Sequence, residues 1–182
     1  MKQTTSNAGK TFERFWDSSE KVASISARIA GMLPKVPRDT AYTFGLFREI
    51  GIPLMMQRFP DYRETLQLAT SADTPMTEVE ESRYSTSHAI IGRMVARTWL
   101  LPDEITEGIL LHHDPAVLRA DNGISSPAKT LVMINYLAEY LHEKTFRMRE
   151  DAQWQHNSEA VLDYLGISHT EVVDLQEHIS EE

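Results

Sequence analysis

The stretch from Glu81 to His113 holds the side chains best suited to chemistry, namely His88 and the adjacent pair His112-His113. Glu81 and several other carboxylates lie in or beside the same stretch. Imidazole and carboxylate groups are the usual protein ligands of divalent transition metals. No tight spacing such as H-E-x-x-H is present, so the same histidines also fit packed or hydrogen-bonded structural residues. Both interpretations stay open from spacing alone.

Helical spacing surrounds these histidines. The apolar positions that carry it are Ala89, Ile90, Met94, Val95 and Trp99, followed after Pro102 by Ile105, Ile109, Leu110 and Leu111. Adjacent residues of a helix point about 100° apart. One of His112 and His113 could therefore face the core while the other faces a cleft.

The same reasoning predicts further helices at about 10–33, 40–50, 53–59, 62–69, 128–144, 158–165 and 170–179. Asp39 is a plausible N-cap, Thr77 and Glu80 form a weak capping-box pattern, and Gly51 suits a left-handed helix end. Residues 1–9 are expected to be a flexible leader and residues 147–157 to be loosely ordered. No segment alternates as a strand would. We predict one all-α domain over residues 1–182.

Composition narrows the classes of function. The chain has 182 residues, 41% hydrophobic and 25% charged, which is typical of a globular protein. It has no cysteine, which excludes disulfides and thiolate metal sites. The formal net charge of -9 works against binding to nucleic acid or to an anionic membrane. No apolar run approaches the roughly 20 residues that span a bilayer, and no signal peptide is evident, so we expect a cytoplasmic protein.

Residues 45–51, GLFREIG, resemble the GLLHDIG helix end of the HD superfamily of metal-dependent phosphohydrolases. The wider order of residues resembles the HDOD domain, an HD-related output domain of bacterial signalling proteins. This order comprises Phe15 to Ser19, Phe59-Pro60, Glu81, His88, Gly92, Trp99, Leu101-Pro102, Ile105, Ile109 and His112-His113. The resemblance runs from about Phe12 to Leu141. It implies a compact HD-like helical bundle, without the additional N-terminal helical lobe usual in HDOD domains.

The resemblance also implies metal ligands at positions where this chain has other residues. The first histidine of the HD pattern falls on Ser18, the His-Asp pair on Arg48 and Glu49, and the late aspartate on Asn135. An arginine cannot ligate a metal, and its charge repels a dication. We expect a degenerate pocket with no catalytic residue and no cofactor, formed by Ser18, Arg48, Glu49, Glu81, His88, His112, His113 and Asn135. Arg48 should pair with an acidic residue, Glu81 being the leading candidate.

Three functions follow as hypotheses. The first is a non-catalytic signalling module that contacts a partner protein or an upstream sensory domain. The second is a metal-dependent phosphohydrolase or phosphodiesterase acting on nucleotides, with zinc, manganese or iron held by His88, His112 and His113. The third is a module that binds a small anion through Arg48 and the histidines. Phe12, Phe15 or Trp16 should lie on a partly exposed apolar patch, where the N-terminal helix could mediate homo-oligomerisation.

Overall fold

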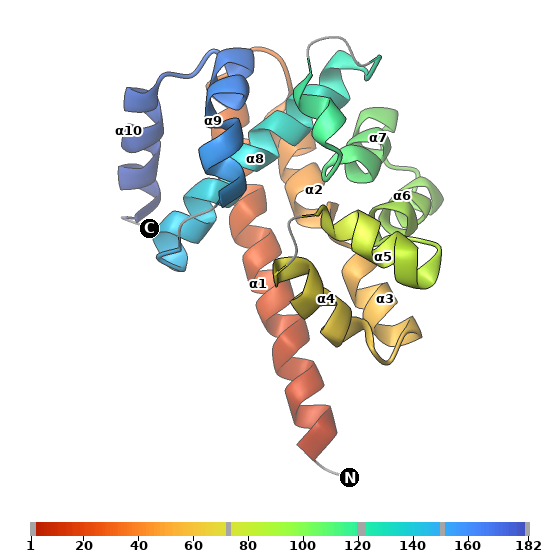
Figure 1. Ribbon diagram of the computed structural model, residues 1–182. Coiled ribbons are helices and arrows are strands. Elements are labelled where there is room, and N and C mark those ends of the chain that lie inside the picture. Colours follow the sequence, from red (N-terminus) through yellow and green to blue (C-terminus); the bar gives the residue numbers. More distant parts are fainter. Residues whose placement is uncertain (1–2, 72–73, 120–122, 150–151, 181–182) are drawn as a thin grey trace.

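A computed structural model describes residues 3–71, 74–119, 123–149 and 152–180, and this part of the chain is helical without a strand (Figure 1). The prediction of an all-α fold is confirmed. The elements are α1 (Gln3–Ala30), α2 (Arg38–Phe47), α3 (Gly51–Arg58), α4 (Tyr62–Ser71), α5 (Met76–Tyr84), α6 (His88–Thr98), α7 (Asp103–Leu111), the 3-10 helix η1 (Pro115–Leu118), α8 (Ser126–Phe146), α9 (Ala152–Leu165) and α10 (His169–Ser180).

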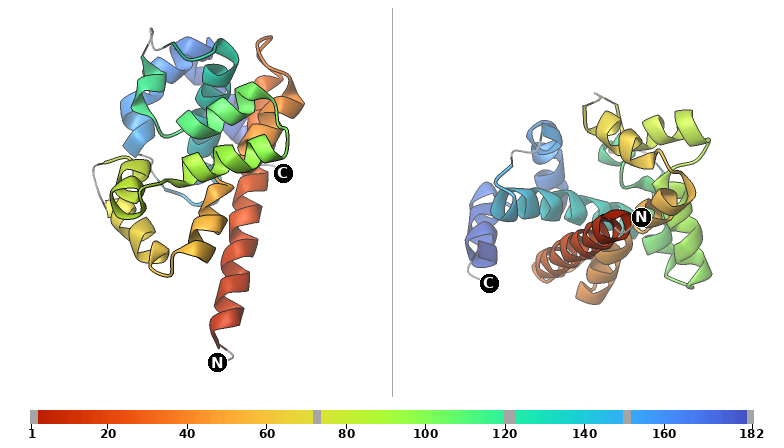
Figure 2. Two further views of the ribbon diagram at one scale, coloured as in Figure 1. Left: turned by 90° about the vertical axis from the view of Figure 1, so that its right-hand side faces the viewer. Right: turned by 90° about the horizontal axis from the view of Figure 1, so that it is seen from below.

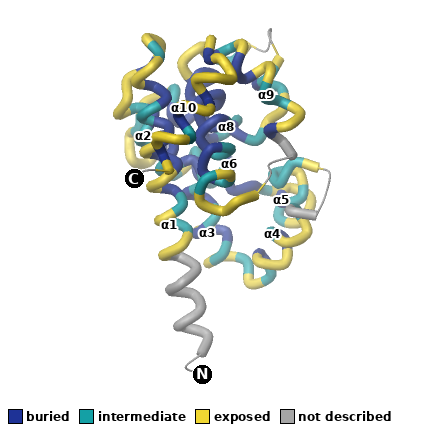
Figure 3. Tube along the Cα trace, turned by 90° about the vertical axis from the view of Figure 1, so that its left-hand side faces the viewer, coloured by how far each residue is buried: buried dark blue, intermediate teal, exposed yellow. Residues whose placement is uncertain are grey.

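Helix α8 lies at the centre of the molecule. It packs against α1, α2 and α7 on one side and against α9 and α10 on the other (Figures 1 and 2). Its buried residues are spread around the helix rather than confined to one stripe, as expected of a helix enclosed by others (Figure 3). Helices α2 and α7, which lead into Glu49 and the His112-His113 pair, are therefore positioned against this central helix, whereas α6 with His88 packs against α3 and α7.

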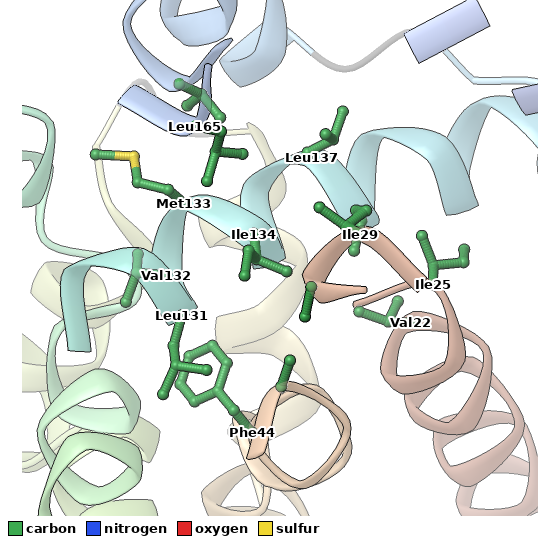
Figure 4. Close-up of a cluster of buried hydrophobic side chains, with 14 of the residues drawn as sticks. Val22, Ile25, Ile29, Phe44, Leu131, Val132, Met133, Ile134, Leu137 and Leu165 are labelled. Carbon is green, nitrogen blue, oxygen red and sulfur yellow. The ribbon is translucent and has the colours of Figure 1, made fainter. Parts of the chain in front are cut away.

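An apolar core holds these helices together (Figure 4). Val22, Ile25 and Ile29 of α1 meet the central residues of α8, and Phe44 of α2 lies beside Leu131. All five of these side chains are nearly or completely excluded from solvent. Burial of an aliphatic or aromatic side chain stabilises a fold by about 1.5–3 kcal/mol. The core thus fixes the relative positions of α1, α2 and α8; residues of α1, of α8 and of the turn after α2 line the cavity described below.

Helix α1 is the longest element, with 28 residues and a length of about 42 Å. It begins at Gln3, so the prediction that the helix starts near Lys10 was wrong. Its first turns extend beyond the bundle (Figures 1 and 2). Trp16 is 39% exposed and packs edge-on against Phe15, with ring centroids 5.2 Å apart. This confirms a partly exposed apolar patch; the side chain of Phe12 lies outside the described residues.

Three local predictions are corrected. Pro37, not Asp39, precedes α2 as its N-cap, and Asp39 lies in the first turn. The capping box is absent, because Pro75 precedes α5 without a side-chain cap and Glu80 is fully buried. Helix α9 begins at Ala152, so most of the segment expected to be loosely ordered is helical. Within the described residues, no helix has the length and apolarity that a bilayer crossing requires.

Candidate functional site

Four side chains from three separate parts of the sequence converge on one point. Glu49, His88, His112 and His113 each direct a potential ligand atom to it, and these atoms all lie within 4.8 Å of one another. Glu49 Oε2 is 3.2 Å from His88 Nε2, and Glu49 Oε1 is 3.5 Å from His112 Nε2 and 3.6 Å from His113 Nε2. We call these four residues the histidine cluster. The three histidines singled out in the sequence do meet, and Glu49 joins them.

Both members of the histidine pair face the cluster, contrary to the expectation that they diverge. Helix α7 ends at Leu111, and His112 and His113 lie in the turn that follows. The turn brings their rings together, with centroids 4.1 Å apart. The expectation assumed a continuing helix, and the chain leaves the helix one residue too early for it to hold.

Gly51 permits Glu49 to approach His88. It begins α3 directly after the tight turn that carries Arg48 and Glu49. A Cβ atom at Gly51 would lie 2.0 Å from the backbone oxygen of His88, well inside van der Waals contact. The backbone of Gly51 is not left-handed, so that prediction was wrong. The glycine is required because two chain segments touch here.

Glu80 orients His88. Its Oε2 accepts a hydrogen bond from the backbone N–H of His88 at 2.9 Å and lies 2.7 Å from His88 Nδ1, while its Oε1 accepts one from the hydroxyl of Tyr62. Glu80, Tyr62 and His88 are all fully buried. Glu81, the residue expected in the pocket, is exposed on α5. The α5 carboxylate that supports His88 is therefore the preceding residue, Glu80.

The hydrogen bonds define which ring nitrogens face the centre. A carboxylate or a carbonyl only accepts, so Nδ1–H of His88 donates to Glu80, and Nδ1–H of His112 donates to the carbonyl of Ile109 at 2.7 Å. In the neutral rings the lone pairs then reside on the two Nε2 atoms, which face each other at 3.4 Å. Such an arrangement is favourable only when a proton or a cation lies between the nitrogens.

The spacing fits a divalent cation. At Zn–N distances of about 2.0–2.1 Å, tetrahedral geometry separates neighbouring ligand atoms by about 3.3 Å. The distances among these ligand atoms include 3.2, 3.4, 3.5 and 3.6 Å. Glu49 Oε2 and His113 Nε2 are buried and form no hydrogen bond with the described residues. An outward hydrogen bond that fixes the ring of a ligating histidine, as Glu80 would provide, is typical of protein metal sites.

Charge within the cluster is strongly coupled. Burial acts to raise the pKa of Glu49, but His88 and His112 outweigh it and hold that pKa well below its ordinary value. Burial lowers the pKa of His112 to about 4. Burial also acts to lower the pKa of His113, but contact with Glu49 outweighs it and the net shift is upward. The cluster therefore favours an ionised carboxylate beside at least one neutral imidazole, as metal binding requires.

Arg48 is buried beside the cluster and pairs with a residue of α8. Its Nε donates to Glu139 Oε1 at 2.7 Å, and its Nη1 donates to the carbonyl of Gly45 at 2.6 Å. The expectation of a buried arginine with an acidic partner is confirmed. The proposed partner, Glu81, is wrong, because Glu139 on the central helix is the residue that contacts the guanidinium.

Ser18 and Arg48 line a cavity of about 400 Å³ that reaches Glu49. Ser18 Oγ lies 3.4 Å from Nε2 of His142, a buried residue of α8. Asn135 is buried one turn before Glu139, does not line this cavity, and has no hydrogen-bond partner for Oδ1 among the described residues. The structure thus brings Ser18, Arg48 and Glu49 together and leaves Asn135 aside.

Sequence reasoning missed Glu80, Glu139 and His142. Glu139 and His142 follow Asn135 at one and two helical turns on α8, so the face they share was available in the sequence. Glu80 carried a weaker signal, because its neighbour Glu81 is chemically identical and only the helix rotation distinguishes them. The burial of a carboxylate can be predicted from sequence only when the buried face of its helix is known.

The family comparison covers most of these elements. A family model described as the HDOD domain matches residues 1–115, which include Ser18, Arg48, Glu49 and the three histidines. A comparison with curated proteins gave no match. The match ends two residues after His113, before α8 begins.

Solved structures with the same fold extend over more of the chain. A protein of Shewanella amazonensis SB2B, provisionally assigned as a phosphohydrolase, shares 19% identity at a TM-score of 0.68, over 92% of this chain and 59% of its own. The MmoQ response regulator of Methylococcus capsulatus shares 18% identity at a TM-score of 0.67, over 91% and 61% respectively.

An HDOD domain protein of unknown function from Geobacter sulfurreducens shares 20% identity at a TM-score of 0.60, over 92% of this chain and 61% of its own. The chain therefore spans about three fifths of the length of these structures. At such identities the likeness shows the fold, and the family match rests on the sequence pattern itself. The chain belongs to the HDOD domain family.

Proposed function

We propose that this chain is a non-catalytic regulatory module of bacterial signal transduction that acts through contacts with other proteins. The observation that carries the proposal is Arg48, a buried guanidinium in the cavity where the HD pattern would place metal ligands. A guanidinium neither ligates a metal nor accepts a proton at physiological pH. Its charge is already balanced by Glu139, so the cavity around Arg48 offers no uncompensated negative charge to a second cation.

The assignments of structures with a similar fold support the signalling role. Among the similar structures, one is a response regulator and another, from Marinobacter aquaeolei VT8, is provisionally assigned to signal transduction. The second shares 20% identity at a TM-score of 0.68, over 92% of this chain and 36% of its own. Modules that work through contacts need exposed apolar side chains, and this chain has them at Trp16 on α1 and at Met94, Trp99 and Leu100 around the end of α6.

An activity screen and a sedimentation experiment test the proposal together. We expect no turnover of phosphomonoesters, nucleotides or cyclic dinucleotides with added manganese, iron, zinc or magnesium. Replacing Trp16 by glutamate should weaken self-association or partner binding without changing the unfolding midpoint. The same charge placed at Leu68, another exposed apolar residue on α4, which packs against α3 and α5, is the matched control. Metal-dependent turnover that is lost in His88→Ala protein would overturn the proposal.

A second candidate function is metal binding by the histidine cluster, with phosphohydrolase activity as its catalytic form. The convergence of Glu49 Oε2 and the two Nε2 atoms at 3.2–3.4 Å favours it. A divalent ion held there would act as a Lewis acid and would lower the pKa of a bound water. Four protein ligands are typical of closed structural sites, whereas catalytic sites keep a position open for water. The cluster therefore supports a structural ion better than a catalytic one.

Metal content and stability separate these possibilities without relying on activity. Stoichiometric zinc, manganese or iron by elemental analysis, removable by chelation and absent from His112→Ala protein, would establish the site. At a free metal concentration of 100 times the dissociation constant, binding should stabilise the fold by about 2.7 kcal/mol. Arg48→Met protein should keep this increment, because Arg48 contributes no ligand. Metal-free protein that shows no stabilisation with any of these ions would dismiss this candidate.

A further inference from the structure

A groove beside the Arg48 cavity gathers positive charge in an otherwise acidic protein. Its volume is about 500 Å³, and the charged residues that line it are Arg14, Lys21, Arg147 and Arg149 with a single carboxylate, Asp17. The whole chain carries a formal charge of -9. Four cations around one small space repel each other unless an anion offsets them. We name this space the basic groove.

The arginines of the groove are only partly neutralised by the protein. Arg147 contacts Glu143 at 3.3 Å and is 44% exposed, so this pair is weak. Among the described residues, neither Arg14 nor Arg149 forms an ion pair with a carboxylate. By contrast, Arg48 in the neighbouring cavity is fully engaged with Glu139 and Gly45. The anion site hypothesised at Arg48 is therefore better placed one step outward, at the guanidinium groups of Arg14, Arg147 and Arg149, which the described residues neutralise only in part.

Neutral hydrogen-bonding groups lie where the groove meets the cavity. Ser18 Oγ accepts from Arg147 Nη2 at 3.3 Å and lies 3.4 Å from His142 Nε2. His142 is 4% exposed, and burial, followed by the charges of Arg147, Arg48 and Lys21, lowers its pKa to about 4. The positive charges of Lys21 on α1, Arg48 in the turn after α2 and Arg147 at the end of α8 therefore all act on the buried ring of His142. An anion at the mouth of the groove would meet this same positive field.

An aromatic ring forms part of the wall. Phe146 is 41% exposed at the end of α8, and Lys21 Nζ lies 4.2 Å from the centre of its ring. A volume of about 500 Å³ is in the range of small-molecule sites and exceeds what a lone phosphate would fill. Arginines recognise phosphate oxygens through paired N–H donors, and an aromatic face suits a planar apolar group.

We propose that the basic groove binds a small soluble phosphorylated metabolite such as a nucleotide, with Arg14, Arg147 and Arg149 on the phosphate and Phe146 against the remainder. This site is distinct from the histidine cluster and needs no metal. It would give the module a ligand input through α1 and α8, the two helices that form its walls.

Calorimetry with the intact chain in the presence of a chelator tests the site. Pyrophosphate and AMP should bind and raise the unfolding midpoint, whereas adenosine, which lacks a phosphate, should not. Arg14→Glu and Arg149→Glu should each weaken AMP binding about tenfold or more. Arg97→Glu is the matched control, because Arg97 is exposed on α6 outside the groove, and it should change the affinity less than about twofold.

Three outcomes would overturn the proposal. The first is no binding of either phosphate-bearing probe at millimolar concentration. The second is an equal loss of affinity in Arg97→Glu and Arg149→Glu protein, which would indicate a diffuse field rather than a site. The third is binding to vesicles that contain phosphatidic acid without binding to the soluble probes, which would assign the groove to a lipid headgroup. None of these outcomes depends on whether the histidine cluster binds metal or the module is catalytic.

Discussion

The pocket has two halves, the histidine cluster and the cavity around Arg48, and buried charge is compensated differently in each. In the histidine half, Glu49 faces three imidazoles whose free nitrogens converge, and a cation from solution would complete the arrangement. In the arginine half, Arg48 supplies the cation from the chain itself and Glu139 balances it. Both halves meet at the turn between α2 and α3, where Arg48 and Glu49 are adjacent. Two consecutive residues therefore have opposite roles: Glu49 is a potential metal ligand, and Arg48 provides a permanent positive charge in place of a metal.

The histidine half should be the more sensitive to loss of its support. Glu80→Ala removes the acceptor for the Tyr62 hydroxyl and for two N–H groups of His88, all buried. We expect a loss of about 4 kcal/mol in the free energy of unfolding. Urea denaturation measures it, with Glu81→Ala as the neighbouring control, expected to change stability by less than about 0.5 kcal/mol. Equal effects of the two substitutions would contradict the assignment of Glu80.

The junction of the two halves should be nearly as sensitive. Gly51→Ala places a methyl group 2.0 Å from the backbone oxygen of His88, and no side-chain rotation can relieve that contact. We expect about 3 kcal/mol of destabilisation, because α3 and α6 must separate. The variant should also lose any affinity for metal, since Glu49 moves with α3. A variant with unchanged stability would show that the segments do not touch.

Substitution in the arginine half should cost less stability, and a second substitution should restore part of the loss. Arg48→Met leaves Glu139 without its partner in a cavity where its side chain is 29% exposed, and we expect a loss of about 2 kcal/mol. Glu139→Gln in the same chain removes the unpaired charge and should restore at least half of that loss. Thermal unfolding of the single and double variants provides the comparison. Additive losses would mean that the two residues are not coupled.

The smallest effect concerns pH. The pKa of His142 is about 4 in the folded chain, against about 6.5 when unfolded, so the unfolded chain binds more protons between these values. Stability should therefore fall as the pH falls through this window, by about 1 kcal/mol between pH 7 and about pH 5.5. His142→Gln protein should lose that part of the pH dependence. A variant whose stability varies with pH as the native chain does would exclude His142 as its source.

The sequence was sufficient for most of the helices and for the family, because apolar periodicity and the order of motif residues are local properties, but it placed the starts of α1 and α9 too late. It also identified Ser18, Arg48 and the three histidines as neighbours through the resemblance. It failed where rotation about a helix axis decides the partner, as in Glu80 against Glu81. It also failed at α8, because Glu139 and His142 reach the pocket only through tertiary packing. His112 and His113 were misjudged because a helix end, rather than a helix, carries them.

The guanidinium of Arg48 has a consequence for how the protein meets its surroundings. A bound metal is lost when supply falls, and an imidazole changes charge with acidity, but a guanidinium stays charged under all physiological conditions. Through its bonds to Gly45 and Glu139 it ties α2 to α8 from the moment the chain folds. This part of the domain needs no loading step, and starvation for metal ions would leave it unchanged.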